Sequence, residues 1–287
     1  MALSAADFNY RRRKLISAVM LGAAATSAIG MIAVLFLILG YVFIQGGQAI
    51  DFAFFTELPR PVGQEGGGMA NAIVGSLIVL AIAGVLAIPV GFFAGIYLSE
   101  YASTTFAGAV RFVIETMAGV PSIVIGIFAF VLIVRPMGTY SAIAGGFALA
   151  MIMIPIFARA AEEALKTVPF SLREAAMALG VPSWRIVLRV VVPTAGPGII
   201  TAAMLALARA GGETAPLIFT ALGNRFWQEG LTSPIATLPV QIWEYASGPY
   251  ADLHRQAWAG SLVLVAMTVG IIGLVRLLYR GTSFRQF

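Results

Sequence analysis

Long apolar stretches constrain this chain more than any other feature of its sequence. A helix crosses a bilayer core about 30 Å thick with about 20 apolar residues, and the sequence offers about six windows of that length. They lie near residues 15–44, 70–97, 110–134, 138–158, 191–221 and 257–279. Because 60% of the 287 residues are hydrophobic and only 11% are charged, an ordinary water-soluble domain is excluded. We expect an all-α integral membrane protein with about six transmembrane helices.

The first window follows a basic cluster, Arg11–Lys14. Such a cluster could open a signal peptide, with a small-residue cleavage site at Ala23–Ala25. The apolar run continues through Phe43, however, far beyond the 7 to 15 or so residues typical of a signal peptide. We therefore predict an uncleaved anchor.

The distribution of lysine and arginine predicts the orientation. Six spans place both termini on one side, and basic residues concentrate in cytoplasmic loops. The basic residues on the side of the termini are Arg11, Arg12, Arg13, Lys14, Arg159, Lys166, Arg173, Arg185, Arg189, Arg276, Arg280 and Arg285, against Arg60, Arg135, Arg225 and Arg255 on the other. We predict cytoplasmic termini, a cytoplasmic 159–190 segment, and outer loops at 45–69 and 222–256.

Several kinds of chemistry are missing from this sequence. Without cysteine there is no thiol nucleophile, and the single His254 cannot build a zinc site alone. Lys14 and Lys166 are the only lysines, and neither belongs to a phosphate-binding Walker A loop. The net charge of +5 fits cytoplasmic loops better than a nucleic-acid surface. We expect no catalytic residue, metal or cofactor, so any ATP that drives this protein is hydrolysed by another chain.

The two outer loops differ from the spans in composition. Leu58–Gly68 is rich in proline and glycine, and Gly66–Gly68 fits a hinge better than an anion-binding nest. The 222–256 segment mixes tryptophan and tyrosine with proline. Its aromatic residues fit a membrane-interface belt, and a docking surface for an extracytoplasmic partner stays open as an alternative. We expect His254 to be solvated or interfacial.

The longest inner segment, 161–192, carries its own helix signals. Ser171 and Glu174 have the spacing of a capping box that would start a short helix. Gly180 would end this helix in a left-handed conformation. Pro182 would then open a second helix at Ser183, running until Pro193. The sequence predicts a helix, a glycine turn and another helix.

This spacing also resembles a known motif. Glu174, Ala175, Ala176 and Gly180, followed by Val190, Val192 and Pro193, resemble the EAA motif of ABC-importer permeases, with valine where the motif has isoleucine and leucine. The resemblance implies that Ser171, Glu174, Ala175, Ala176 and Gly180 form a coupling helix that docks into an ATPase. Small alanine side chains would let the partner's backbone approach closely.

Further stretches resemble the phosphate-specific ABC importer family, in particular its A-type permease. They are Gly67–Leu77, Ala118–Gly126, Ser171–Gly180, Ala208–Ala221 and Pro234–Tyr245. The resemblance implies a type I ABC importer permease fold in the membrane of a prokaryotic cell, with the coupling helix between spans four and five. It also implies a C-type permease partner in a heterodimer, two copies of a cytoplasmic ATPase, and an extracytoplasmic binding protein that delivers inorganic phosphate.

The resemblance suggests three regions. Residues 1–66 would hold the N-terminus, the first span and an outer loop. Residues 67–280 would form the transmembrane core, and 281–287 a cytoplasmic tail.

Two charged residues interrupt the fifth apolar window. Arg209 and Glu213 would each cost about 2.5 to 3.5 kcal/mol in a bilayer unless paired or wet, so we expect them to face the bundle interior. Four residues apart on one helical face, they could form a purely structural salt bridge. Gly211 and Gly212 between them weaken the helix, which favours a substrate pathway that includes Arg209, Glu213 and Thr214. The Arg209 guanidinium would bind phosphate oxygens. Glu213 could accept a proton that phosphate carries and sulfate lacks, or it could neutralise Arg209 in the resting state.

A second charged pair, Arg111 and Glu115, opens the third window. A structural pair, or Arg111 reaching toward lipid headgroups, is favoured here, and a pathway role for Arg111 stays open. Gly119, Pro121 and Gly126 follow, which allows a kink or close helix packing.

Three other functions are alternatives for a chain of this kind. A solitary secondary transporter or channel would use intramembrane charges but has no use for a coupling helix. A membrane enzyme lacks catalytic groups here. An ABC permease for sulfate, molybdate or a sugar would share the coupling helix and differ in the pathway.

Overall fold

The computed structural model describes residues 5–61, 64 and 66–283, and these are almost entirely helical. The only strand-like pairings in this part of the chain are two isolated bridges, Pro59 with Gly67 and Leu222 with Ile235. The expected tail 281–287 falls partly outside the described residues, and 281–283 continue the last helix.

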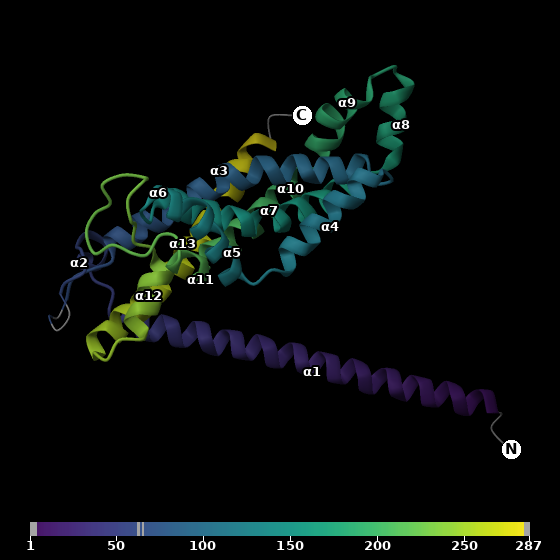
Figure 1. Cartoon of the computed structure of the whole chain (residues 1–287). Helices are drawn as coiled ribbons and strands as arrows, with labels where there is room; N and C mark the ends of the chain where they lie inside the picture. Colours follow the sequence, from purple (N-terminus) through teal and green to yellow (C-terminus); the bar gives the residue numbers. More distant parts are fainter. Residues whose placement is uncertain (1–4, 62–63, 65, 284–287) are drawn as a thin grey trace.

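Five long helices carry the fold (Figure 1). They are α1 (Ala5–Gly47), α3 (Ala70–Glu100), α7 (Ala142–Lys166), α10 (Val192–Gly211) and α13 (Ala251–Ser283). The shorter elements are α2 (Phe52–Thr56), α4 (Thr105–Gly119), α5 (Ser122–Ala129), η1 (Phe130–Val134), α6 (Arg135–Met137), α8 (Phe170–Ala178), α9 (Ser183–Ile186), η2 (Val187–Val191), α11 (Ala215–Ile218) and α12 (Leu238–Ala246). Within the described ranges, five helices can cross a membrane by length and composition, or six if a bent pair counts as one. The expected membrane fold of about six spans is confirmed.

The core lies between α3 and α7, which share the most extensive contact in the molecule. Small residues allow this approach: a Cβ on Gly95 would lie 2.9 Å from the Cβ of Ala161 and 3.0 Å from the carbonyl oxygen of Ala158. Helix pairs in membranes favour such small residues because packing, not water exclusion, drives their association. Helix α10 covers this pair and completes the main apolar cluster.

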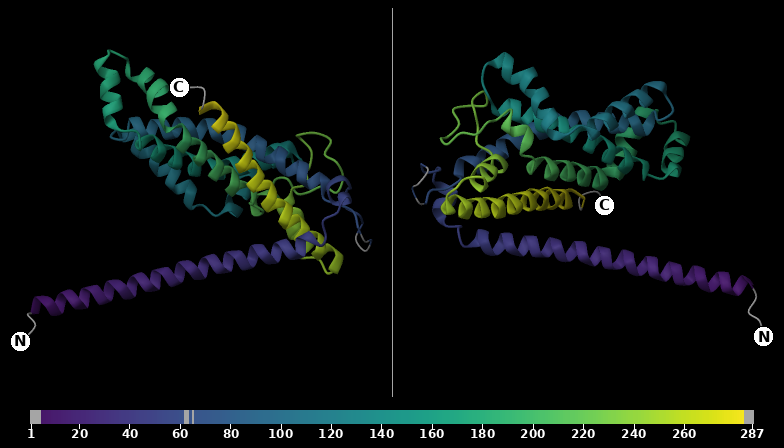
Figure 2. Two further views of the ribbon diagram at one scale, coloured as in Figure 1. Left: turned by 180° about the vertical axis from the view of Figure 1, so that it is seen from behind. Right: turned by 60° about the horizontal axis from the view of Figure 1, so that its bottom comes forward.

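Helix α1 stands apart from the bundle (Figure 2). None of its most apolar stretch is buried, and only its last turns contact the rest of the chain. There Gly46 lies against Trp258 of α13, and the ring of Tyr41 packs edge-on against the same tryptophan at 5.1 Å. The core therefore owes little to α1.

The third apolar window is not one straight span, which corrects the prediction of a helix over 110–134. Helix α4 ends at Gly119, and the chain resumes as a helix at Ser122 after a bend of 103°. Pro121 is the N-cap of α5, with an extended ψ of 138°. A proline disfavours helical geometry at the residue before it, and the break falls at Val120 for that reason.

The fifth window also departs from its prediction. The helix through it starts at Ser183 and continues through Pro193 instead of ending there. A π-helical turn, η2, precedes the proline. Such a turn gives the ring room that a regular α-helix would deny it. The far end is shorter than expected, because α10 stops at Gly211.

The molecule has two distinct ends (Figures 1 and 2). Helices α8 and α9 and the C-terminal part of α13 lie at one end, while α2, α12 and the 222–237 loop lie at the other. This separation agrees with the expected grouping of inner and outer segments. Which end faces the cytoplasm remains a prediction from the basic residues.

Candidate functional site

Helices α8 and α9 form the expected helix, glycine turn and helix. Gly180 has a φ of +74°, and the N–H of Val181 binds the carbonyl oxygen of Ala176 at 3.3 Å. Glycine adopts this left-handed conformation without the strain that a side chain would add. Pro182 is the N-cap of α9, as predicted.

The predicted capping box is wrong. Helix α8 begins at Phe170, with Pro169 as its N-cap and no side-chain cap. Ser171 is therefore the second residue of the helix, where its hydroxyl cannot serve the first turn as an N-cap does. The fixed φ of Pro169, −57° with an extended ψ of 137°, leads directly into the helix and makes the serine cap unnecessary.

The predicted coupling residues lie on an exposed helix. Ser171, Glu174, Ala175 and Gly180 are exposed, and only Ala176 packs partly against a small apolar cluster that includes Leu165, Val168 and Ile186. No side chain of α8 is buried. Between Phe170 and Ile186, the exposed large apolar residues are Phe170, Leu172, Met177, Leu179 and Trp184. Such a surface is typical of a helix that binds another protein.

An ion pair that sequence reasoning missed holds α8 in place. The Nη1 atom of Arg173 lies 2.6 Å from both carboxylate oxygens of Glu100, the last residue of α3. Both side chains are largely shielded, at 17% and 15% exposure. The two residues stand 73 positions apart, so no local spacing rule could have joined them.

Arg209 and Glu213 line a cavity of about 500 Å³ together with residues of α4, α5 and α7. The wall includes Met117, Ala118, Val120, Pro121 and Ser122, at the break between α4 and α5. Two interrupted helices therefore meet at one cavity, because α10 also ends beside it, at Gly211. Membrane transporters commonly build ion sites where broken helices expose their ends.

The two charges lie close together but in different surroundings. Arg209 Nη2 is 3.4 Å from Glu213 Oε1, with side-chain exposures of 62% and 15%. The prediction of one continuous helical face is wrong, because Glu213 lies beyond the end of α10 and its N–H binds the carbonyl oxygen of Ala210. Arg209 faces open space in the single chain, not a closed bundle interior. Its position in the last turn of α10 is favourable for a cation.

The third predicted pathway residue, Thr214, is the N-cap residue of the short helix α11. Its carbonyl oxygen accepts from the N–H of Leu217 and of Ile218. Thr214 is not among the residues that line the Arg209 cavity. Helix α11 instead packs on α5, with Gly126 directly against Pro216.

Arg111 pairs with a residue that was not predicted. Its Nη2 atom lies 2.7 Å from Oε1 of Glu162 on α7, and Glu115 lies 3.6 Å from Arg159. The prediction of an Arg111–Glu115 pair is wrong, because tertiary packing brings α7 closer than the next turn of α4. Glu162 is fully buried and also binds Arg159 and Lys166, at 2.9 and 2.7 Å. A buried carboxylate needs such partners to stay ionised.

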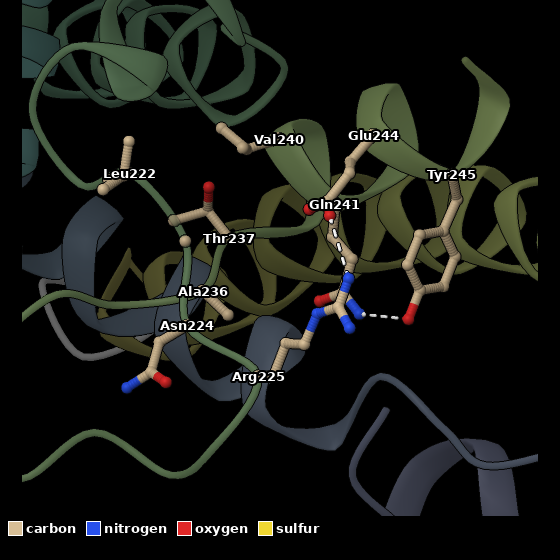
Figure 3. A pocket seen from close by; sticks show the side chains of 10 residues that line it. Leu222, Asn224, Arg225, Ala236, Thr237, Val240, Gln241, Glu244 and Tyr245 are labelled. Atoms are coloured by element: carbon tan, nitrogen blue, oxygen red, sulfur yellow. Dashed lines mark hydrogen bonds and ion pairs between the residues drawn. The ribbon is translucent and has the colours of Figure 1, made fainter. Parts of the chain in front are cut away.

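A second cavity, of about 280 Å³, lies between the 222–225 loop and α12, at the end of the molecule opposite α8 (Figure 3). Arg225 reaches from the loop to Glu244 of α12 at 3.5 Å, and both side chains are about half exposed. Beside them the amide of Gln241 donates to the hydroxyl of Tyr245 at 3.2 Å. Burial raises the pKa of Tyr245 above its usual range, so this hydroxyl stays neutral. With its cation already paired, the cavity fits a loop-to-helix contact better than an anion site.

His254 is exposed, as expected, and its Nε2 atom lies 2.7 Å from the carbonyl oxygen of Gly248. Nearby, Gln256 donates to the carbonyl oxygen of Gly66 at 2.8 Å. Gly66 and Gly67 both have positive φ, of +86° and +83°. This glycine-rich turn therefore has a defined conformation against α13.

Comparison with known proteins gives consistent matches. The family described as "Binding-protein-dependent transport system inner membrane component" matches residues 87–284. The phosphate transport system permease protein PstA of Yersinia pestis is 41% identical over 271 residues, covering 94% of this chain and 91% of the relative. The protein of that name from Mycobacterium leprae is 37% identical over 240 residues, covering 82% and 79%.

Solved structures support the fold. An inward-facing structure of the MetNI methionine ABC transporter matches with a TM-score of 0.56 and 21% identity, over 73% of this chain and 93% of that one. An amino acid ABC transporter with histidines matches with a TM-score of 0.51 and 22% identity, over 72% and 92%. The predicted ABC importer permease fold is confirmed.

Proposed function

We propose that this chain, which belongs to the family of binding-protein-dependent transport system inner membrane components, is the A-type permease subunit of an ATP-driven phosphate importer. The substrate follows from the relatives, which carry the name phosphate transport permease at up to 41% identity over most of the chain. The chain is a multi-pass membrane protein and a transport subunit.

The observation that carries the proposal is the Arg209 cavity. It joins a guanidinium, a carboxylate and the ends of two interrupted helices beside Ile152 and Pro155 in the central part of α7. A guanidinium presents a planar set of donors that suits phosphate oxygens. Because the half-open ion pair at 3.4 Å is already loose, phosphate can replace Glu213 as the partner of Arg209.

Glu213 then has one of two roles. In the first, it accepts a hydrogen bond from the protonated oxygen of monohydrogen or dihydrogen phosphate, which sulfate cannot donate. In the second, it neutralises Arg209 while the pathway is empty and gives way when phosphate arrives. The low exposure of Glu213 supports the first role, because a shielded carboxylate has few water partners and gains most from an incoming hydrogen-bond donor.

Arg111 and Thr214 have weaker claims to the pathway. Arg111 is held by the buried Glu162, so it would meet phosphate only after that pair opens. We infer that Arg111 mainly joins α4 to α7. Thr214 would act through its backbone by starting α11 beside Glu213.

The remaining subunits follow from the family. Helix α8 would dock into a cytoplasmic ATPase through Ser171, Glu174 and Ala175, with Ala176 and Gly180 shaping the turn. A C-type permease would complete the pore, and the end that carries α2 and α12 would receive an extracytoplasmic binding protein. Residues 67–280 would form the transport core, with the termini in the cytoplasm of a prokaryotic cell.

Reconstituted transport tests the proposal. Proteoliposomes that hold the complete transporter should take up radiolabelled phosphate, and Arg209→Gln should abolish uptake while the ATPase stays bound. Arg12→Gln is the matched control, because Arg12 is an exposed arginine on α1 far from the cavity. Wild-type transporter that moves no phosphate, or Arg209→Gln that transports normally, would overturn the proposal.

Attachment of the ATPase is measured separately. Glu174→Ala should lower the amount of ATPase that copurifies with the permease, whereas Glu163→Ala, at an exposed position of α7, should not. Competition by sulfate and molybdate in the same vesicles tests the alternative that another oxyanion is the substrate.

A further inference from the structure

Helix α8 has few attachments to the rest of this chain. None of its side chains is buried, and Ala176 makes its main apolar contact, with the cluster around Leu165 and Ile186. The Arg173–Glu100 ion pair joins α8 directly to α3, and Ala176 and Ile96 of these two helices also pack on the same apolar cluster. A movement of α8 would therefore act on α3 at its last residue, Glu100.

Glu100 belongs to a tightly built corner between α3 and α4. The rings of Tyr97 and Tyr101 stack at 5.2 Å, and Phe106 packs edge-on against Tyr97 at 5.6 Å. Thr104 caps α4 through the N–H of Ala107, while its hydroxyl also lies 3.1 Å from that of Tyr97. These contacts join the end of α3 to the start of α4, so the two should move together.

Helix α4 leads from this corner to the Arg209 cavity. Its 15 residues span about 22 Å at 1.5 Å per residue. Part of the way along, Arg111 fixes α4 to the buried Glu162. At the far end, Met117 and Ala118 form part of the cavity wall. A Cβ added at Gly119, the last residue of the helix, would meet nothing within 4 Å. Helix α4 is thus joined to α3 at its start and to α7 near its middle, with open space beside Gly119 at the cavity end.

We propose that the Arg173–Glu100 ion pair transmits the movement of α8 to α4, and through α4 to the wall of the Arg209 cavity. Arg173 is a positioning residue in this proposal, because it touches neither ATP nor substrate. The inference rests on the proposed function, since it takes α8 as the helix that the ATPase moves. It adds a specific contact through which hydrolysis opens the substrate path.

The geometry supports transmission by this pair. A guanidinium nitrogen that is 2.6 Å from both oxygens of a shielded carboxylate resists separation more than an exposed pair does. The two partners lie on helices in different parts of the transporter. Arg173 lies on α8, at the proposed inner surface, and Glu100 ends α3, which packs with α4 in the core. Loss of either partner should leave both helices folded but without their direct polar link.

The test measures phosphate imported per ATP hydrolysed, in proteoliposomes of the complete transporter with binding protein and phosphate outside. Arg173→Gln and Glu100→Gln should each lower this ratio at least about fivefold, the low end of coupling factors between distant sites. The ATPase should still copurify. The double variant should be no worse than either single variant, because both remove one contact.

A charge exchange and a control make the test specific. Arg173→Glu combined with Glu100→Arg should recover part of the ratio that each reversal alone removes. Arg185→Gln should leave the ratio unchanged, because Arg185 lies at the same end but stacks on Trp184, with 5.1 Å between the guanidinium carbon and the ring centre.

Two results would overturn the proposal. The first is a normal ratio in both glutamine variants. The second is loss of the ATPase from the complex, which would mean that the pair shapes the docking surface instead of transmitting movement. Wild-type vesicles that import no phosphate would instead reject the proposed function itself, so the two failures can be told apart.

Discussion

The contact between α5 and α11 at Gly126 offers a direct test of how closely the cavity is built. A Cβ at this position would lie 2.7 Å from the Cα atom of Pro216 and 3.2 Å from its carbonyl oxygen. Both are backbone atoms, so no flexible side chain can move aside. Gly126→Ala must therefore push the two helices apart.

The size of the effect follows from these distances. Bringing the new Cβ from 2.7 Å to an ordinary contact of 3.4 Å requires a shift of about 0.7 Å. Overpacking of this kind costs about 1 to 3 kcal/mol, and the better helix propensity of alanine returns about 1 kcal/mol. We expect a net loss of about 0 to 2 kcal/mol in stability. Because α5 starts beside Pro121 and α11 starts close to Glu213, a shift of this size should also lower phosphate uptake about tenfold.

The assay compares Gly126→Ala with Gly22→Ala, for thermal unfolding in detergent and for uptake in vesicles. Gly22 lies in α1, where a Cβ would meet nothing within 4 Å, so alanine there should be neutral or stabilising. If Gly126→Ala is as stable and as active as Gly22→Ala, the close approach of α5 and α11 is not needed, and the reasoning fails.

Three further predictions concern single residues. Glu162→Gln should destabilise the protein by about 3 to 5 kcal/mol, because it leaves three cations around a fully buried site; thermal unfolding checks this, with Glu163→Gln expected to change stability by less than about 0.5 kcal/mol. Gly180→Ala should weaken ATPase copurification, because a φ of +74° costs alanine about 1 to 2 kcal/mol; unchanged recovery would show that the turn tolerates a side chain. Glu213→Gln should reduce the preference for phosphate over sulfate in competition uptake, and an unaltered preference would leave Glu213 only its neutralising role.

Local signals predicted much of this fold. Apolar windows of sufficient length identified all the long helices, because hydrophobic length is set by the bilayer and needs no knowledge of neighbours. The α8–α9 element followed from Gly180 and Pro182, whose backbone preferences act within one turn. The interruption after Arg209 followed from two adjacent glycines.

What the sequence missed depends on contacts between distant segments. Arg111 was matched with Glu115 by helical spacing, whereas the folded chain supplies Glu162 from α7. The Glu100–Arg173 ion pair could not be predicted for the same reason, since its partners are far apart in the sequence. The predicted Ser171 cap is wrong for a local reason, because Pro169 is the N-cap and the helix begins at Phe170, one residue before the serine.

The break in the third window was only half visible from sequence. Gly119 and Pro121 suggested a kink, but a kink and a bend of 103° differ in which residues reach the cavity. The larger bend places Val120 and Ser122 on the wall that faces Arg209. The bend goes together with the packing of α5 on α11, a contact between distant segments that no local signal predicts.

The free-standing helix α1 has a consequence for the surrounding lipid. Its apolar stretch, from residue 15 to residue 44, is about 45 Å long. That is half as long again as a hydrocarbon layer about 30 Å thick. To bury that length in lipid, α1 must tilt by about 45–50° from the bilayer normal or locally thicken the bilayer. With its anchor only near Trp258, the helix can change its lean as the membrane changes thickness, while the transport core keeps its shape.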